Sequence, residues 1–276
     1  MSLPEFLICL ALALAGMGLF NQPSSQARKW GLIVFWLGSG VGIYFITGKI
    51  AWGAFVLLAW ILVPLAEMMV VLRKLRLPHE REFRDAVPPI TEFPTLREIT
   101  REYEDLGFKK VDDCDLTPHF HETYYRLFHH SEHPSHGVIG FISQGEIGFS
   151  FHAFFSEQTD GKIWLTWDYP LTYGLKTPPN ISIYRLSETE TIEELWKEHL
   201  AFLEINQVAE SSLILTSTAE EIRDRLARSL NRQLEYNIHE GILLPEVAQD
   251  LHHLRYSWRG IWFVTRQMAR DLLGWS

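Results

Sequence analysis

The stretch that decides the architecture of this chain is residues 30–48, WGLIVFWLGSGVGIYFITG, in which no side chain carries a charge at neutral pH. Built as an α-helix, it would be roughly 28 Å long, which is close to the hydrocarbon thickness of a bilayer, about 30 Å. Lys29 precedes the stretch and Lys49 follows it. We therefore predict a transmembrane helix at residues 30–48.

A second uncharged stretch, residues 50–66, follows almost at once and is extended by Glu67 and further apolar residues. A carboxylate near the end of a span can reach the interface, so Glu67 is compatible with a membrane helix. Only a short turn separates this stretch from the first one. We therefore predict a helical hairpin whose second span is residues 50–72.

The earliest apolar run, residues 6–20, would make only about 22 Å of helix. Its small residues Ala13-Leu14-Ala15 resemble a signal-peptide cleavage site, but no Lys or Arg precedes them, and this disfavours cleavage. Extended to residues 4–22, the run is long enough to span with local thinning of the bilayer. We expect three transmembrane helices, with two as the alternative.

The charge of the chain is unevenly distributed. The net charge is -9, but residues 1–77 have 6 basic and 2 acidic side chains, so this part carries +4 and the rest carries -13. The acidic balance of the larger part argues against nucleic-acid binding, which needs a basic surface. We predict a transmembrane region at residues 1–77, with the lipid bilayer as a partner and no nucleic acid.

Basic residues near the ends of the spans predict the orientation, because cytoplasmic loops of membrane proteins are enriched in Lys and Arg. Arg28 and Lys29 lie between the first two spans, and Lys49 lies between the second and the third. Five basic residues follow the third span: Arg73, Lys74, Arg76, Arg81 and Arg84. We expect a multi-pass membrane protein whose large C-terminal domain is cytoplasmic, and a two-span chain would leave that domain on the same side.

Two glycines in the second span, Gly38 and Gly42, are four residues apart and therefore lie on one helix face. Small residues at this spacing allow membrane helices to approach closely. We predict that Gly38 and Gly42 pack against a neighbouring span, and dimerisation through this face is the alternative.

The rest of the chain has the pattern of an α+β domain. Residues 78–94 are rich in charge and contain Pro88-Pro89, as expected of a linker, and the domain is predicted at residues 95–276. It begins with a helix at about residues 95–106. Alternating runs predict an antiparallel meander of four strands, with a possible fifth, at residues 122–129, 138–143, 147–155, 162–168 and 181–186. We expect the first helix to cover the face that carries Phe149, Phe151 and Phe155.

Three more helices are predicted after the meander. The first starts near Thr191 and the second near Thr218, and the third is an amphipathic helix at about residues 245–273. Basic side chains line the second and third helices off their apolar stripes, namely Arg225, Arg228, Arg232, Arg255, Arg259, Arg266 and Arg270. We consider contact with anionic lipid headgroups for these arginines. The alternatives are a solvated face, packing against the domain or the spans, and self-association.

Six of the 12 histidines fall between residues 119 and 136. Imidazole is a common ligand of zinc and other transition metals, and His119 and His121 across a hairpin from His136 would supply three ligands. The same residues are also compatible with an exposed polar turn or a pH-sensitive surface. A divalent metal such as zinc at these three histidines is therefore a hypothesis, and no other cofactor is predicted.

No common catalytic or nucleotide-binding motif is found. The chain has no Gly-x-Ser-x-Gly elbow, no phosphate-binding Gly-Lys-Ser/Thr loop and no dinucleotide fingerprint. Of its two cysteines, Cys9 lies in the first span and Cys114 in the domain, which excludes a disulfide within the domain. We predict a membrane-anchored cytoplasmic module that binds a protein partner or a small ligand. The alternatives are a membrane-tethered, metal-dependent enzyme and a subunit of a larger membrane complex.

Overall fold

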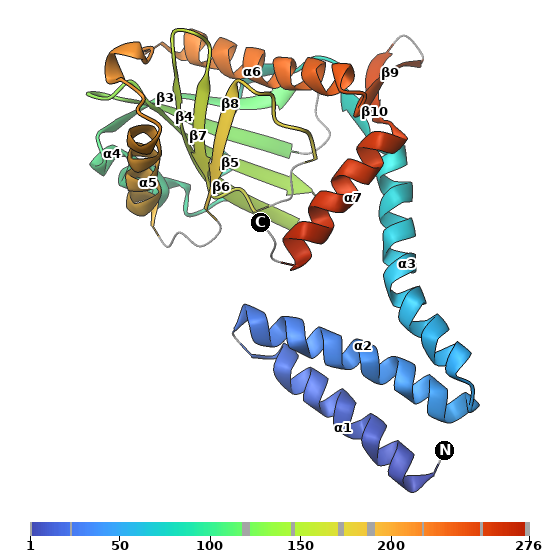
Figure 1. The fold of residues 1–276 in the computed structure, drawn as a ribbon. Helices are drawn as coiled ribbons and strands as arrows, with labels where there is room; N and C mark the ends of the chain where they lie inside the picture. Colours follow the sequence, from blue (N-terminus) through green and yellow to red (C-terminus); the bar gives the residue numbers. More distant parts are fainter. Residues whose placement is uncertain are drawn as a thin grey trace. The chain divides into compact units, whose positions relative to one another are not determined.

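The computed structural model describes the whole chain except residues 1, 23, 118–121, 145–146, 171–173, 187–190, 217, 249–250 and 274–276. The chain divides into two compact units, Met1–Lys74 and Leu75–Ser276 (Figure 1). We call them the N-terminal unit and the C-terminal unit and describe each by itself.

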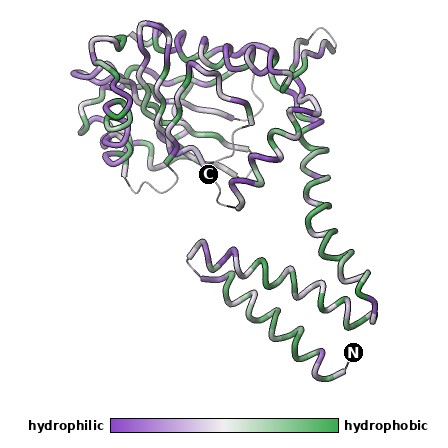
Figure 2. Tube along the Cα trace, in the orientation of Figure 1, coloured by the Kyte–Doolittle hydropathy of each residue, from purple (hydrophilic) through white to green (hydrophobic). Residues whose placement is uncertain are grey.

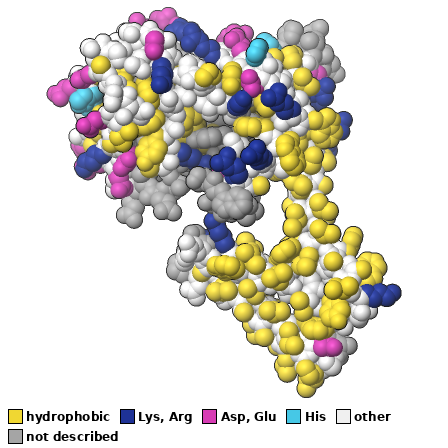
Figure 3. All heavy atoms as spheres, in the orientation of Figure 1, with side chains coloured by type: hydrophobic (Ala, Val, Ile, Leu, Met, Phe, Trp, Pro, Cys, Tyr) yellow, Lys and Arg dark blue, Asp and Glu magenta, His cyan; other side chains and the backbone are white. Residues whose placement is uncertain are grey.

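The N-terminal unit consists of helices α1 (Leu3–Phe20), α2 (Ser25–Thr47) and α3 (Ile50–Lys74). Among the described residues, these three helices are long and apolar enough to cross a membrane. Figure 2 shows that hydrophobic residues dominate all three, and hydrophobic side chains cover the face of this unit seen in Figure 3. The prediction that the first apolar run forms a helix of this kind is therefore confirmed. Between α2 and α3 the chain turns at Gly48, where φ is +66°.

Three glycines of α2, Gly31, Gly38 and Gly42, face α1. A Cβ atom at Gly38 would lie 3.2 Å from the Cβ atom of Leu12, and one at Gly42 would lie 3.7 Å from Sγ of Cys9. The closest approach of the two helices involves a glycine that the sequence did not single out: a Cβ atom at Gly31 would lie 2.6 Å from the backbone nitrogen of Phe20. The two helices therefore pack backbone to backbone near Gly31.

The C-terminal unit is built on a sheet of seven strands within the described residues, in the order β2-β3-β4-β5-β6-β7-β8. Neighbouring strands are antiparallel except β7 and β8, which are parallel. The strands are β2 (Glu82–Asp85), β3 (Phe108–Thr117), β4 (Glu122–His130), β5 (His136–Gln144), β6 (Ile147–Glu157), β7 (Ile163–Trp167) and β8 (Ile181–Arg185).

The α+β class and the central meander agree with the sequence prediction, but the strand count does not. Strand β2 lies inside the stretch taken for a linker, residues 78–94, and β3 was not predicted at all. Both strands are rich in charged residues, and Lys110 and Asp112 flank an irregularity in the pairing of β3 with β4. Such strands lack the clean alternation of polar and apolar residues by which a strand is identified in a sequence.

Helices cover both faces of the sheet. On one face, α4 (Leu96–Asp105) and α5 (Ile192–Ile205) bury an aromatic core that includes Phe128 and Phe154. On the other face, α6 (Ala219–His239) packs against a second core that includes Leu127 and Phe155. Figure 1 shows α6 running alongside the sheet on the side away from α4 and α5. The expectation that the first helix covers the Phe155 face was wrong, because the central strands are apolar on both faces and α4 occupies the Phe154 face.

The remaining strands form a small antiparallel sheet in the order β1-β10-β9. Its strands are β1 (Arg76–Pro78), β9 (Leu243–Ala248) and β10 (Leu251–Tyr256), and helix α7 (Trp258–Leu273) follows, while a 3-10 helix (Glu210–Ser212) precedes α6. The predicted helix at residues 245–273 is therefore wrong in its first part. Pro245 disfavours a helix interior, and β10 is stabilised by pairing with β1, far away in the sequence.

Candidate functional site

A cavity of about 340 Å³ lies between α6 and the sheet of the C-terminal unit. Seven strands contribute to its wall, together with the loop before β8 and one side of α6. The side chains that line it are mostly apolar, and they include Phe83, Leu116, Tyr125, Val138, Ile142, Phe151, Ala153, Phe155, Ile163, Leu165, Trp167, Tyr169, Leu175, Ile181, Ile183, Leu226 and Leu230. Ligand-binding cavities are typically concave, apolar and about 300–1,000 Å³ in volume, so this is the best candidate for a binding site.

One wall of the cavity is a group of aromatic rings around Phe151. This ring lies 5.0 Å from Tyr169 and 6.2 Å from Trp167, centroid to centroid, in edge-to-face contacts, and Tyr169 stacks on Trp167 at 4.9 Å. The ring of Phe151 also lies over β5 at Gly140, where a Cβ atom would be only 2.2 Å from it. Any larger residue at position 140 would push Phe151 aside, so Gly140 fixes the shape of this wall.

Few charged groups reach the cavity. Among its described lining residues, these are Arg81, Arg225 and Glu157. Arg225 of α6 donates to Oε2 of Glu157 on β6 at 2.8 Å, so the two charges largely compensate each other. Arg225 is therefore engaged inside the C-terminal unit, and this pairing leaves it less available for the lipid contact considered from the sequence.

Arg81 is fixed by its backbone to α6. Its backbone nitrogen donates to Oδ1 of Asn231 at 2.9 Å, and its carbonyl oxygen accepts from Nδ2 of Asn231 at 3.0 Å. The side chain is different, because its Nε atom is buried and has no hydrogen-bond partner among the described residues. Burial lowers the pKa of the Arg81 guanidinium, and the nearby phenols of Tyr125, Tyr256 and Tyr169 oppose this effect.

Tyrosine hydroxyls provide further polar groups near Arg81. Burial raises the pKa of Tyr125 and of Tyr169, and it raises the pKa of Tyr256 to about 12. All three phenols are therefore neutral at physiological pH and keep a proton that they can donate. The hydroxyl of Tyr256 donates to the carbonyl oxygen of Gly174 at 2.9 Å.

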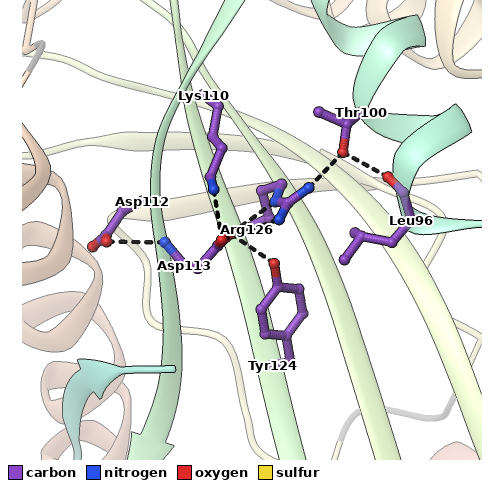
Figure 4. A network of polar contacts seen from close by, with 7 residues as sticks. All are labelled: Leu96, Thr100, Lys110, Asp112, Asp113, Tyr124 and Arg126. Carbon is purple, nitrogen blue, oxygen red and sulfur yellow. Dashed lines mark hydrogen bonds and ion pairs between the residues drawn. The ribbon is translucent and has the colours of Figure 1, made fainter. Parts of the chain in front are cut away.

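A polar network on the opposite face of the sheet is self-contained (Figure 4). Arg126 donates through Nε and Nη2 to the two carboxylate oxygens of Asp113, at 2.7 and 3.0 Å, and through Nη1 to Oγ1 of Thr100 at 2.8 Å. Asp113 also accepts from Tyr124 and Lys110, each at 2.6 Å. These hydrogen bonds satisfy the groups that they join, so the network holds β3, β4 and α4 together and offers no open site.

A second buried chain of polar groups is also structural. Ser135 and Ser156 share a hydrogen bond of 2.7 Å between their hydroxyls, and Ser156 contacts Nε2 of His199 at 3.1 Å. Nδ1 of His199 contacts Oγ1 of Thr166 at 3.0 Å. All four side chains are buried. Because no solvent reaches His199, this arrangement of serine and histidine lacks the access that a nucleophile needs.

A smaller hollow of about 200 Å³ beside α4 and α5 includes His152 and Asp168 among its lining residues. The backbone nitrogen of His152 donates to Oδ1 of Asp168 at 2.5 Å. Burial lowers the pKa of His152 and raises the pKa of Asp168. This contact runs through the backbone, and Nδ1 of the His152 imidazole has no hydrogen-bond partner among the described residues. The hollow is also less than two thirds of the volume of the cavity beside α6.

The structure describes one of the three histidines of the predicted metal site. His119 and His121 lie outside the described residues, and His136 is buried at the start of β5. Nε2 of His136 lies 2.9 Å from the carbonyl oxygen of Thr216, so this nitrogen carries the proton and donates. The part of the chain that the structure describes contains no group of three side chains arranged to hold a metal ion. A metal at the three histidines stays a prediction.

The predicted lipid-contact arginines occupy three elements rather than two helices. Arg228 and Arg232 are exposed on α6, whereas Arg255 lies on β10, with Nε 3.9 Å from a carboxylate oxygen of Glu246. Helix α7 carries the other three, Arg259, Arg266 and Arg270, which are exposed.

Helix α7 also exposes two large aromatic side chains. Trp258 and Trp262 are 63% and 64% exposed, one helical turn apart. Lys and Arg side chains gather over α7 on the face shown in Figure 3. Aromatic and basic side chains together are typical of a helix at a membrane surface. Lipid contact by α7 is thus compatible with the structure and stays a prediction.

The cavity was not predicted from the sequence, and neither was the position of Arg81 in its lining. The alternation in β6 predicts the apolar face with Phe151 and Phe155, but it does not show which helix covers that face. The sequence also predicts an apolar stripe on α6 without a partner. Matching this stripe to the apolar face of β6 would have located the cavity. The chain matches no known protein family, and comparisons with curated proteins and with solved structures find no similar protein.

Proposed function

We propose that this chain is a membrane-anchored binding module whose C-terminal unit holds a small apolar molecule in the cavity beside α6. The observation that supports it is the cavity itself, about 340 Å³ lined mainly by apolar and aromatic side chains. Protein interiors are close-packed, and voids much larger than a water molecule are few. A hollow of this size leaves apolar side chains exposed to water unless a ligand covers them, which favours a binding role.

The three apolar helices of the N-terminal unit are proposed as the membrane anchor. An apolar ligand has a low concentration in water and accumulates in the bilayer, so a tethered module meets its ligand where that ligand is concentrated. The anchor therefore fits the chemistry of the cavity. Binding of a protein partner, metal-dependent catalysis and membership of a larger membrane complex stay predictions from the sequence.

The proposed orientation places the C-terminal unit in the cytoplasm, on the argument from basic flanking residues. A reporter that is active only in the cytoplasm is expected to be active when fused after Ser276 and silent when inserted at Lys49. Measuring both fusions in the same cells controls for expression. An inactive fusion at Ser276 with an active one at Lys49 would reverse the proposed orientation.

Filling the cavity is expected to abolish binding of an uncharged apolar probe. Ser229 lies on α6 and lines the cavity, so Ser229→Trp places an indole in the space that a ligand would occupy. The fluorescence of N-phenyl-1-naphthylamine rises in an apolar site and can be titrated against the full chain in phosphatidylcholine nanodiscs. We expect saturable binding to the unmodified chain and at least a tenfold loss of affinity in Ser229→Trp.

The matched control is Arg228→Trp, which adds the same side chain at the neighbouring, exposed position of α6. We expect this variant to bind the probe with unchanged affinity, and empty nanodiscs supply the background. Equal binding by Ser229→Trp and the unmodified chain, or a signal no greater than that of empty nanodiscs, would contradict the proposed function.

A further inference from the structure

The charge of the cavity is unbalanced. Arg225 and Glu157 form an ion pair, which leaves Arg81 as the one described lining cation without a carboxylate partner in the described part of the chain. Its Nε atom is buried and forms no hydrogen bond there. A buried charge is costly unless it is paired, and a buried donor without an acceptor adds to the cost. The cavity thus has a positive charge that no described carboxylate pairs with, on a mostly apolar wall.

Arg81 is held in place by its backbone, although no carboxylate among the described residues pairs with its side chain. The two hydrogen bonds between its backbone and Asn231 tie residue 81 to the middle of α6. A polar side chain of α6 thus holds the backbone of an arginine that lines a mostly apolar cavity. A guanidinium group typically pairs with carboxylate or phosphate oxygens through two parallel N–H donors.

We infer that the ligand of the cavity is an amphipathic anion, with an acidic head paired to Arg81 and an apolar body along the aromatic wall around Phe151. This inference rests on the proposed function and adds the chemical class of the ligand. The neutral hydroxyls of Tyr125 and Tyr169 also line the cavity and supply further donors for the head. A fatty acid or a similar monoacid has the required combination of one charge and a long apolar part.

The test compares two competitors that differ only in the head, dodecanoic acid and dodecan-1-ol. Each is titrated against N-phenyl-1-naphthylamine bound to the full chain in phosphatidylcholine nanodiscs at pH 7.5. The unmodified chain is expected to bind the acid at least tenfold more tightly than the alcohol. Arg81→Met, which keeps an unbranched apolar side chain but removes the charge, is expected to lose at least tenfold for the acid and to bind the alcohol and the probe as before.

The control variant Arg228→Met removes an exposed arginine from α6 and is expected to preserve the preference for the acid. Equal affinities of the unmodified chain for acid and alcohol would overturn the inference and leave the proposed function intact. A preference for the acid that survives in Arg81→Met would also overturn it, because the head would then bind elsewhere. Failure of the probe itself to bind would contradict the proposed function as well.

Discussion

Replacement of Arg126 by methionine is expected to lower the free energy of unfolding of the C-terminal unit by about 3–5 kcal/mol. Arg126 and Asp113 are both nearly buried, with side chains 9% and 11% exposed. Burial alone would raise the pKa of Asp113, but hydrogen bonds from Arg126, Lys110 and Tyr124 hold it below its ordinary value. Without Arg126 the carboxylate loses its strongest partner in a place that water barely reaches.

The matched control is Arg84→Met, because Arg84 belongs to an exposed pair with Glu82 in which both side chains are more than 60% exposed. Exposed pairs contribute about 0–1 kcal/mol. Urea titration of the full chain, read by pulse proteolysis of the C-terminal unit, gives both values. Adding Asp113→Asn to Arg126→Met should recover part of the loss, since it removes a carboxylate whose remaining ion-pair partner is the more exposed Lys110. A loss in Arg126→Met no larger than that in Arg84→Met would show that the network does not stabilise the fold.

Acidification from pH 7 to pH 5 is expected to destabilise the C-terminal unit by about 4 kcal/mol through His136 and His199. Burial lowers the pKa of His136 to about 4 and that of His199 to about 3. Both folded-state values lie below the unfolded value of about 6.5. The unfolded chain therefore takes up a proton at each histidine between pH 7 and pH 5, whereas the folded chain does not, and each site costs about 2 kcal/mol.

The sign of this effect follows from the depressed pKa values. The stability contributed by keeping each histidine neutral is fully present above about pH 6.5 and is lost as the pH falls towards the folded-state pKa. His136→Gln removes one titrating group but keeps an N–H donor for the carbonyl oxygen of Thr216. The difference in unfolding free energy between pH 7 and pH 5 should therefore shrink by about half in this variant.

His239→Gln is the control, because His239 is exposed at the end of α6. Its substitution is expected to change the pH dependence by less than about 0.5 kcal/mol. The same urea titration at the two pH values makes the comparison. An unchanged pH dependence in His136→Gln would mean that this histidine takes up its proton without unfolding.

The parts of the fold that depend on local patterns could be predicted from the sequence. The three long apolar helices follow from uninterrupted runs of uncharged residues, and the central meander follows from alternation in strands such as β6. The small sheet could not be predicted in this way. Strand β10 pairs with β1, which is some 180 residues away in the sequence. The apolar residues of β10 and α7 also recur at roughly the 3.6-residue period of a helix, so the sequence pattern indicates one continuous helix there.

The candidate site depends still more on distant contacts. Arg81 counted in the sequence as one of several basic residues after the third span, and nothing local distinguishes it from Arg84. Its place beside the cavity becomes visible only when Asn231 of α6, 150 residues away, is seen to hold its backbone. A cavity forms where the side chains of two apolar faces do not fill the space between them. The periodicity of apolar residues predicts the faces but not the space left between them.

The most direct test of the central claim is to identify what fills the cavity in the native membrane. The full chain and Ser229→Trp would be purified in parallel from native membranes, and the small molecules released on denaturation would be compared by mass spectrometry. We predict a small molecule with a large apolar part, close to one per chain, that accompanies the unmodified chain and is missing from Ser229→Trp. The same set of molecules in the same amounts from both proteins would contradict the account of this chain as a ligand-binding module.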